Sequence, residues 1–398
     1  MNFLFVTTDD ILRNASSNIR NAALISGLVA NGNDVTIISI CHGHTIDDAL
    51  KEAIKGSRLI YANKEFRNHH GEVGKGFSLK FFLKRMLLKI YNKFRIYDPY
   101  VYRIPKDFSF LKGLSYDVLI SSSDPRSSHL FAKKILQRNK KHVTWIQYWG
   151  DPMANDISSS KLMGLFLKKA EKRILSYADL IVYTNQATVN LLSDIYNLPK
   201  SKILSIPTSY YIGNVKKKNV TQIVPGTIKV GYFGEYYSAK RNMKPIVQSI
   251  MRMNDFSLYL IGNTDCDYSG NEKIIQYPKM SAKQVEQFQD EMDILLVVEN
   301  IPVEGKECIQ IPGKMYHYGL SDKKVLVISE SGLIKKEFDK YGRYLFCDND
   351  TNQIENALLS LYKNDSSSMS KPLDEFSPRR VAGLLTERIE SYGSKCEK

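Results

Sequence analysis

The stretch IKVGYFG, residues 228–234, is a short run of apolar and aromatic residues that ends in a glycine turn. It follows SYYIGNVKKKNVTQIVPG, residues 209–226, which is polar, basic and without helical periodicity. A short apolar strand after such a segment is typical of the first strand of a new sheet. The stretch therefore predicts that a second α/β domain begins here and that residues 209–226 are a linker.

Apolar, strand-like runs alternate with amphipathic helical stretches on both sides of this linker. Before it, strands are expected at residues 2–8, 34–40, 117–123, 142–149, 179–185 and 202–208. After it, they are expected at residues 228–234, 256–262, 273–278, 293–298 and 324–329. Short apolar strands separated by helices imply parallel sheets that helices cover on both faces. The prediction is two doubly wound, Rossmann-like α/β domains, residues 1–208 and 227–376, that face each other across a cleft.

The last segment, residues 377–398, is expected to be a helix outside both sheets. Its sequence SPRRVAGLLTERIESY (377–392) has caps and amphipathic spacing of its own. Such a helix can pack on either domain, including by crossing back to the N-terminal one.

The composition is that expected of a soluble, cytoplasmic protein. Hydrophobic residues make up 43% of the 398, and the five cysteines fit neither a disulfide framework nor a zinc site. The first residues, MNFLFVTTDD, lack the basic start of a signal peptide, and no segment approaches the roughly 20 apolar residues of a membrane-spanning helix. The net charge of +14 could draw the protein to nucleic acid, anionic lipid or phosphorylated substrates.

Open α/β sheets bind their ligands at the carboxyl ends of the strands, so the loops after the predicted strands are candidate sites. After the first strand, Ser16, Ser17 and Asn18 open a helix and can offer hydrogen bonds to a phosphate or a sugar hydroxyl, or simply cap the helix. After the glycine turn of the second domain, Lys240 and Arg241 are placed for a diphosphate clamp, or are solvated.

Two further loops carry residues of possible chemical use. WIQYWGDPM, residues 145–153, ends a strand with Trp149 and Asp151, which could stack on a sugar and accept its hydroxyls, or pack the core and cap a turn. IQIPGKMYHYG, residues 309–319, places Lys314 in the first turn of a helix, where it could bind an anion. The alternative is a helix that buries its tyrosines.

Metal binding and several common reaction classes find little support in the motifs. The triplets at residues 265–267 and 348–350 have the Asp-x-Asp form, which can hold a divalent metal. Both lie in polar, turn-like stretches, where Asp and Asn are common because their side chains hydrogen-bond the backbone of turns. Zinc spacings, Walker loops, GxSxG and an initial GxGxxG are missing from the sequence. This argues against hydrolases, P-loop enzymes and typical dehydrogenases, and no metal or other cofactor is expected.

The sequence as a whole resembles the GT-B glycosyltransferases, most closely the family 4 type of bacterial capsule and O-antigen assembly. In the N-terminal half, SSNIRNAALISGLVANGNDVTIIS and AEKRILSYADLIVYTN are similar to segments of that family. In the C-terminal half, VGYFGEYYSAKRN resembles its glycine–basic turn, and IPGKMYHYGLSDKKVLVIS resembles its donor motif. The resemblance covers nearly the full chain and implies a nucleotide-sugar donor site in the C-terminal domain and an acceptor site in the N-terminal one.

Carried over residue by residue, the resemblance implies a set of donor-binding residues. These are Gly234, Lys240, Arg241, Glu307, Gly313, Lys314 and His317. Three positions depart from the family pattern. His317 stands where the family has a glutamate that holds the ribose, and Glu307 matches the first family glutamate only if its loop shifts by two residues. Glu235 also stands where related enzymes have an arginine.

The activity implied is transfer of a sugar, with retention of configuration, from a nucleotide-diphosphate sugar to a glycan acceptor in surface polysaccharide synthesis, and a lipid-linked acceptor is expected. Arg241, Lys314 and Asp151 are expected to carry catalysis, and Ser16, Ser17, Asn18 and Trp149 to meet the acceptor or a phosphate. Two alternatives stay open: a GT-B nucleotide-sugar 2-epimerase, and a catalytically degenerate subunit that scaffolds a partner transferase. Nucleic acid is not an expected partner, because only the net charge favours it.

A basic segment, LKFFLKRMLLKIYNKFR (79–95), predicts contact with an anionic membrane. On a helix its apolar residues form one face, while Lys84, Arg85 and Lys89 lie on the remainder with further apolar residues among them. The expectation is a protein held peripherally at the inner face of the cell membrane. The alternative is a domain helix whose apolar stripe joins the core.

Overall fold

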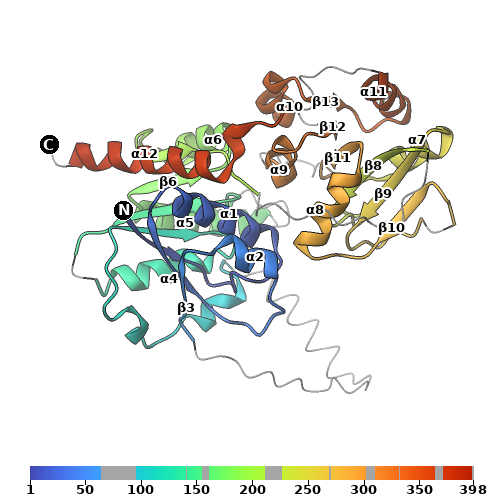
Figure 1. Ribbon diagram of the computed structural model, residues 1–398. Helices are drawn as coiled ribbons and strands as arrows, with labels where there is room; N and C mark the ends of the chain where they lie inside the picture. The colour runs from blue at the N-terminus through green and yellow to red at the C-terminus, as the bar shows by residue number, and fades with distance from the viewer. Residues whose placement is uncertain are drawn as a thin grey trace, which may run out of the picture.

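The computed structural model describes residues 1–63, 96–139, 141–154, 161–210, 226–268, 270–301, 310–330, 332–363 and 371–396. The described chain forms two α/β domains that lie side by side, with the N-terminal one in blue to green and the C-terminal one in yellow to brown (Figure 1). Residues 64–95, with the predicted membrane segment, lie outside the described residues, as do Glu307 and most of the predicted linker.

The N-terminal domain is built on a parallel sheet of seven strands in the order β3-β2-β1-β4-β5-β6-β7. The strands are β1 (Asn2–Val6), β2 (Asp34–Ser39), β3 (Arg58–Tyr61), β4 (Val118–Ser122), β5 (Thr144–Trp149), β6 (Leu180–Tyr183) and β7 (Ile203–Ser205). The helices are α1 (Ser16–Ala30), α2 (Asp48–Ala53), α4 (Ser127–Leu136), α5 (Lys161–Ser176) and α6 (Gln186–Tyr196), with short 3-10 turns at Pro99–Arg103 and Ser109–Leu111.

Side-chain alternation along the strands divides this domain into two hydrophobic cores. Phe3 and Phe5 of β1 point into the core beneath α1, while Leu4 and Val6 point into the core beneath α4 and α5. All four side chains are buried, as expected for a central strand of a sheet that helices cover on both faces.

The C-terminal domain repeats the plan with six parallel strands in the order β10-β9-β8-β11-β12-β13. The strands are β8 (Ile228–Phe233), β9 (Phe256–Ile261), β10 (Ile274–Tyr277), β11 (Ile294–Val298), β12 (Lys324–Ile328) and β13 (Tyr344–Cys347). The helices are α7 (Lys244–Arg252), α8 (Ala282–Glu291), α9 (Gly313–Gly319), α10 (Gly332–Phe338) and α11 (Thr351–Lys363), with 3-10 turns at Asp339–Tyr341 and Asp374–Phe376. The predicted fold class, two doubly wound parallel sheets, is confirmed.

The last helix, α12 (Pro378–Cys396), leaves the C-terminal domain and lies along the N-terminal one (Figure 1). Val381, Leu385 and Ile389 are buried in the same core as α1. The two helices meet closely at Gly27, where a Cβ atom would lie 1.9 Å from the Pro378 carbonyl oxygen. Only glycine leaves room for the chain to cross at this point.

Hydrogen bonds across the cleft hold the carboxyl ends of the two sheets toward each other. The Tyr316 hydroxyl on α9 donates to the Thr184 carbonyl after β6 at 2.8 Å. Near the start of α8, Asn14 Nδ2 donates to the Met280 carbonyl at 3.2 Å. These contacts place the loops that follow the strands of both domains around one space.

None of the helices in the described ranges combines the length and the apolar character that crossing a bilayer requires.

Candidate functional site

A cavity of about 160 Å³ lies between the domains at the carboxyl ends of both sheets. Its walls come from the start of α1, the loops after β5, β6 and β7, the loops after β8 and β11, and the start of α9. The lining residues are Ser16, Arg20, Gly150, Asp151, Thr184, Thr208, Tyr210, Arg241, Glu299, Asn300, Gln310, Ile311, Pro312 and Gly313. Of the residues predicted from the sequence, Ser16, Asp151, Arg241 and Gly313 meet here.

Arg20 is a charged lining residue that sequence reasoning missed. It is only 5% exposed, its guanidinium lies 5.1 Å from the centroid of the Tyr148 ring, and Nη2 donates to the Ser123 carbonyl. Gly150 lies beside it, and a Cβ there would lie 2.1 Å from Arg20 Nη1, so any other residue would push the guanidinium aside. Ser16 and Arg20 stand four residues apart on α1 and so share a face, which is the signal that could have pointed to Arg20.

Arg241 enters the cavity from the C-terminal domain and is held by backbone carbonyls. Its Nε donates to the Val298 carbonyl at 3.1 Å, and Nη1 donates to the Glu235 carbonyl at 2.8 Å. Both acceptors are neutral, so they orient the guanidinium without cancelling its charge. Lys240, predicted as the other half of the clamp, is exposed and does not line the cavity.

Lys314 lies next to Arg241 behind the cavity wall. Its Nζ stands 3.8 Å from the centroid of the Tyr232 ring, and a Cβ at Gly234 would lie 2.9 Å from the same nitrogen. Gly234 also has a φ of +138°, so glycine is required there on two counts. Burial, and then the charge of Arg241, lower the pKa of Lys314 well below its usual value. An anion in this region would favour the charged form of Lys314.

The N-terminus of α9 is covered by an aromatic ring from the other side of the cleft. A Cβ at Gly313 would lie 2.2 Å from Tyr210 Cζ, so the ring packs directly on the first residue of the helix. Tyr210 itself lines the cavity. A ligand that reaches the amide groups of α9 must therefore contact or displace this ring.

His317 lies away from this cavity. Its Nδ1–H donates to the Tyr210 carbonyl at 3.1 Å, and Nε2 lies 2.9 Å from Gln289 Oε1 on α8. Burial is the main cause that lowers the pKa of His317. The imidazole thus ties the chain that enters the linker to α8 and α9, and the structure places it outside the lining that Arg20 and Arg241 share.

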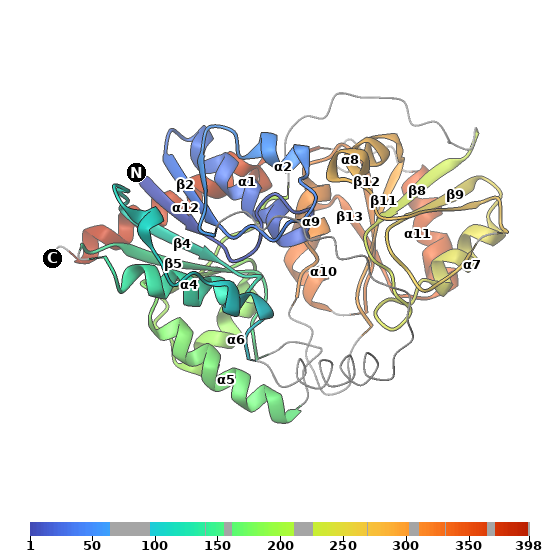
Figure 2. The same ribbon diagram turned by 90° about the horizontal axis from the view of Figure 1, so that it is seen from below.

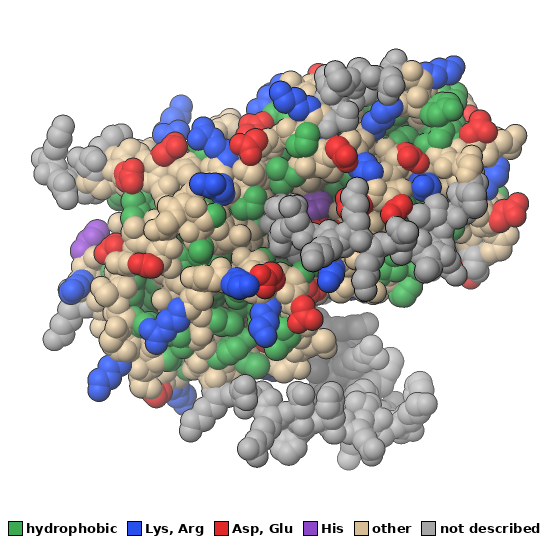
Figure 3. All heavy atoms as spheres, in the orientation of Figure 1, with side chains coloured by type: hydrophobic (Ala, Val, Ile, Leu, Met, Phe, Trp, Pro, Cys, Tyr) green, Lys and Arg blue, Asp and Glu red, His purple; other side chains and the backbone are tan. Residues whose placement is uncertain are grey.

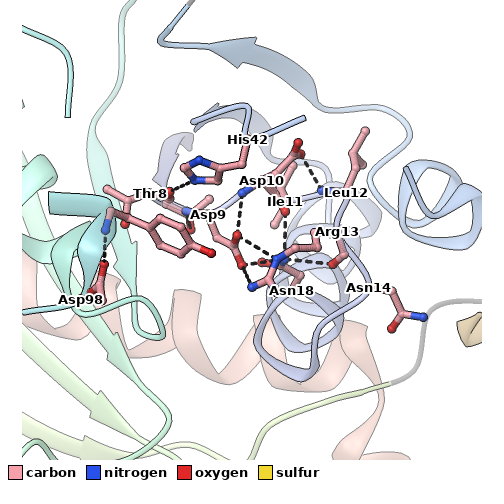
Figure 4. Close-up of polar contacts among 12 residues, drawn as sticks. Thr8, Asp9, Asp10, Ile11, Leu12, Arg13, Asn14, Asn18, His42 and Asp98 are labelled. Carbon is pink, nitrogen blue, oxygen red and sulfur yellow. Dashed lines mark hydrogen bonds and ion pairs between the residues drawn. The ribbon is translucent and has the colours of Figure 1, made fainter. Parts of the chain in front are cut away.

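The loop between β1 and α1 uses most of its polar groups to fix its own shape (Figure 4). The buried Asp9 carboxylate accepts from Arg13 Nε at 3.0 Å and from Asn18 Nδ2 at 3.1 Å. Asn18 Nδ2 also donates to the carbonyls of Asp10 and Arg13. The prediction that Asn18 faces a ligand is not supported, because the side chain is fully buried and its Nδ2 is used within the loop. Ser16 is exposed to the cavity, and Ser17 does not line it.

Trp149 and Asp151, predicted together, have different surroundings. Trp149 is fully buried, donates from Nε1 to Gln147 Oε1 at 3.1 Å and lies 4.1 Å from the His129 ring, centroid to centroid. The prediction that Trp149 stacks on a sugar is wrong for this structure, because both faces of a core side chain are already packed. Asp151, just beyond the strand, is exposed at the cavity.

A second hollow, of about 410 Å³, opens on the other side of Arg241 within the C-terminal domain. Arg241 and Glu299 line both spaces, and Lys244 and Glu330 line this one. Glu299 is 8% exposed and accepts from the Ser329 hydroxyl at 2.7 Å. The guanidinium of Arg241 therefore stands between two spaces that a ligand longer than the small cavity could use.

A larger groove of about 1090 Å³ lies between α1, α8, α9 and the start of α12, and His317 lines it. Glu286 of α8 also lines it, and Oε1 of this side chain makes no hydrogen bond within the described part of the chain. Burial, followed by the charges of Asp290 and Asp47, raises the pKa of Glu286 to about 8. The folded protein therefore favours the neutral form of the Glu286 carboxyl group.

Glu286 should make stability fall as pH rises. The pKa of Glu286 is about 8 in the folded protein and has its ordinary value of 4.5 in the unfolded chain. Its stabilising contribution is therefore complete below pH 4.5 and is lost progressively as the pH rises to about 8. Relative to Glu286→Gln, the wild-type protein should lose on the order of 2 kcal/mol of unfolding free energy between about pH 5 and pH 9. Urea unfolding of both proteins across this range checks the effect, and parallel curves would contradict it.

Comparisons with known proteins bear on the fold. A scan against protein-family models gives no match, and neither does a sequence search of curated proteins. Solved structures match along the chain: HepE of Anabaena, in complex with UDP and glucose, is 9% identical with a TM-score of 0.59, and 100% of both chains is covered. The lipopolysaccharide outer core galactosyltransferase WaaB is 14% identical with a TM-score of 0.56, covering 98% of this chain and 99% of that one.

A UDP-N-acetylglucosamine 2-epimerase matches as well as HepE and WaaB do. It is 14% identical with a TM-score of 0.57, and the match covers 99% of this chain and 97% of that one. Similarity at such identity concerns the fold alone and does not separate transferase from epimerase. The chain therefore has the GT-B fold, two parallel sheets of seven and six strands facing each other across a cavity, as the resemblance predicted.

Proposed function

We propose that the protein is a retaining glycosyltransferase that uses a nucleotide-diphosphate sugar as donor. The observation that carries the proposal is a pair of guanidinium groups, Arg20 from one domain and Arg241 from the other, in one cavity at the carboxyl ends of both sheets. Arginines bind phosphate oxygens through paired, charge-assisted hydrogen bonds. A diphosphate in the cavity would join the two domains through its own charge.

The residues around the cavity suit the departure of a diphosphate. In the reaction the bond between the anomeric carbon and the phosphate oxygen breaks, and a bond from that carbon to an acceptor hydroxyl oxygen forms. Arg241, with Lys314 beside it, would stabilise the negative charge that develops on the leaving oxygen. The acceptor proton would pass to that same phosphate oxygen, so the balance of atoms needs no further base.

Asp151 is the carboxylate placed to handle the acceptor. It follows β5, lies on the N-terminal side of the cavity and is exposed to it. A carboxylate there can accept a hydrogen bond from a sugar hydroxyl and orient it toward the reacting carbon. We propose a glycan acceptor, carried on a lipid, in bacterial surface polysaccharide synthesis at the inner face of the cell membrane. The match to a lipopolysaccharide galactosyltransferase supports this choice.

A second candidate is nucleotide-sugar 2-epimerisation. Two carboxylates, Asp151 and Glu299, line the same cavity from opposite domains, as an acid–base reaction on a sugar would need. The match to a 2-epimerase also supports it. The two reactions differ in their products, since an epimerase returns an altered nucleotide sugar without an acceptor and a transferase releases nucleoside diphosphate.

The test is a thermal-shift screen with UDP, GDP, ADP and TDP, followed by incubation with the sugar derivatives of whichever nucleotide binds. The proposal expects stabilisation by one diphosphate, and slow release of that diphosphate from its sugar even without acceptor. Conversion of the donor to its 2-epimer would replace the transferase assignment with the epimerase. If no nucleoside diphosphate raises the melting temperature, the cavity is not a donor site. The alternative of a catalytically degenerate subunit that scaffolds a partner transferase would then be favoured.

A further inference from the structure

The outer face of α5 exposes large apolar side chains to solvent. Leu165 is 68% exposed and Phe166 is 55% exposed, on a helix whose other face packs into the N-terminal domain. Figure 2 shows α5 along the outer edge of that domain. Two adjacent apolar residues on an outward helix face are costly in water, so they point to a partner surface.

The same face of α5 is basic. Lys168, Lys169, Lys172 and Arg173 are all exposed, and Lys169 and Lys172 follow Leu165 at helical spacings that put them on its face. The single acidic residue of α5 is Glu171, which points inward and is fully buried. The outer face of α5 therefore carries four positive charges and no negative charge of its own.

Residues next to the C-terminal end of α5 extend this character. Tyr177 is 41% exposed, and the ammonium group of Lys133 on α4 lies 3.4 Å from its ring centroid. By contrast, the face of the molecule in Figure 3 shows basic and acidic side chains interspersed. Exposed leucine, phenylalanine and tyrosine side chains thus lie beside clustered lysines at this edge of the protein.

We propose that the outer face of α5 docks on an anionic phospholipid bilayer. Leu165 and Phe166 would enter the boundary between headgroups and acyl chains, while the lysines, with their long apolar stems, would reach the phosphate groups. Charge complementarity selects this partner, because a basic face with apolar side chains at its centre matches an anionic surface with an apolar interior. Docking does not depend on the reaction, but its use in meeting a lipid-linked acceptor rests on the proposed function.

The inner face of α5 connects this surface with the cavity. The Glu171 carboxylate accepts from the backbone N–H of Met153 at 2.6 Å and of Ala154 at 3.0 Å. It also accepts from the Tyr196 hydroxyl at 2.7 Å. Met153 follows Asp151 by two residues, so the helix that would meet the membrane also holds the loop that lines the acceptor side of the cavity.

The first test is co-sedimentation with vesicles of phosphatidylcholine, with and without phosphatidylglycerol. The wild-type protein should bind only the anionic vesicles, and more weakly as salt rises. Replacing Lys168, Lys169 and Lys172 with glutamate should weaken binding by about 100-fold or more. The matched control changes Lys335, Lys336 and Lys340, exposed on the C-terminal domain, to glutamate and alters the net charge equally. This control should bind nearly as the wild type does.

The second test addresses the apolar residues. Leu165→Ser with Phe166→Ser should reduce binding by about 10-fold, and the loss should persist at high salt. Its control, Leu359→Ser with Tyr362→Ser, alters two exposed residues of α11 and should have little effect. Nucleotide thermal shifts of all four variants should stay as in the wild type, which separates a failure of docking from a failure of the proposed function.

Three outcomes would overturn docking at α5. One is a wild-type protein that does not sediment with anionic vesicles even at low salt. Another is an equal loss of binding in the α5 variant and its charge-matched control, which would mean that net charge alone acts. The third is binding to an oligonucleotide, lost in the α5 variant, with no binding to vesicles; the face would then serve nucleic acid.

Discussion

Arg241→Ala is expected to lower kcat/KM for the nucleotide-sugar donor by about 10- to 150-fold. Hydrogen bonds to charged groups contribute about 1.5 to 3 kcal/mol, and this guanidinium is already oriented by the carbonyls of Val298 and Glu235. Because those carbonyls do not neutralise it, the charge is available to the ligand. The loss should fall mainly on kcat if the interaction strengthens as the diphosphate departs.

Lys240→Ala is the matched control for Arg241. It removes a positive charge one residue away, but the side chain is exposed and lies outside the cavity lining. Its effect should be less than about threefold, as expected of a solvated charge. Donor turnover measured for both variants decides the matter. Equal kinetics in the two would mean that Arg241 does not contact the donor.

Arg343→Met is expected to destabilise the protein by about 4 kcal/mol or more. Arg343 is fully buried, with Nη1 donating to the carbonyls of Gly319 and Lys371 and Nη2 to those of Ser321 and Lys323. Methionine fills much of the space but removes a donor from all four carbonyls, and within the described residues only that of Gly319 still accepts a backbone hydrogen bond, from Leu373 N–H. Gly319 ends α9, so the guanidinium also lies at the negative end of the helix whose start forms a cavity wall.

Urea unfolding measures this loss, and Arg252→Met provides the comparison. Arg252 has a 60% exposed side chain and pairs with Glu355 across 3.5 Å. An exposed ion pair of this kind contributes at most about 1 kcal/mol. Arg343→Lys, which keeps a charge but can reach fewer of the carbonyls, should lie between the two. If the urea midpoints of Arg343→Met and Arg252→Met are close to each other, the contacts of Arg343 with the carbonyls add little to stability.

Much of the fold follows from local sequence, because central strands carry their own signal. Residues such as Phe3 to Val6 are apolar without interruption, and that pattern identifies a strand covered on both faces. The edge strands β3 and β13 gave no such signal, since they are short and several of their side chains are only partly buried. The helices α2, α10 and α11 went unpredicted along with those edges.

The candidate site was harder to predict, because it depends on residues that are distant in the chain. Arg241 and Lys314 could be chosen from charge and position after a strand or in a helix start. Arg20 offered only its helical spacing from Ser16, since its partners Ser122 and Ser123 lie about a hundred residues further on. Trp149 misled the prediction for a related reason: its position at the end of β5 says nothing of His129 and Tyr183, which enclose its ring.

The packing of α12 on α1 has a consequence for how the protein folds during synthesis. Val381, Leu385 and Ile389 complete the hydrophobic core beneath α1, although that core belongs to the first half of the chain. Domains usually fold one after another as they leave the ribosome. Here the N-terminal domain keeps an open apolar face until α12 emerges, so the domain that begins to fold first is completed only after the C-terminal domain has been synthesised.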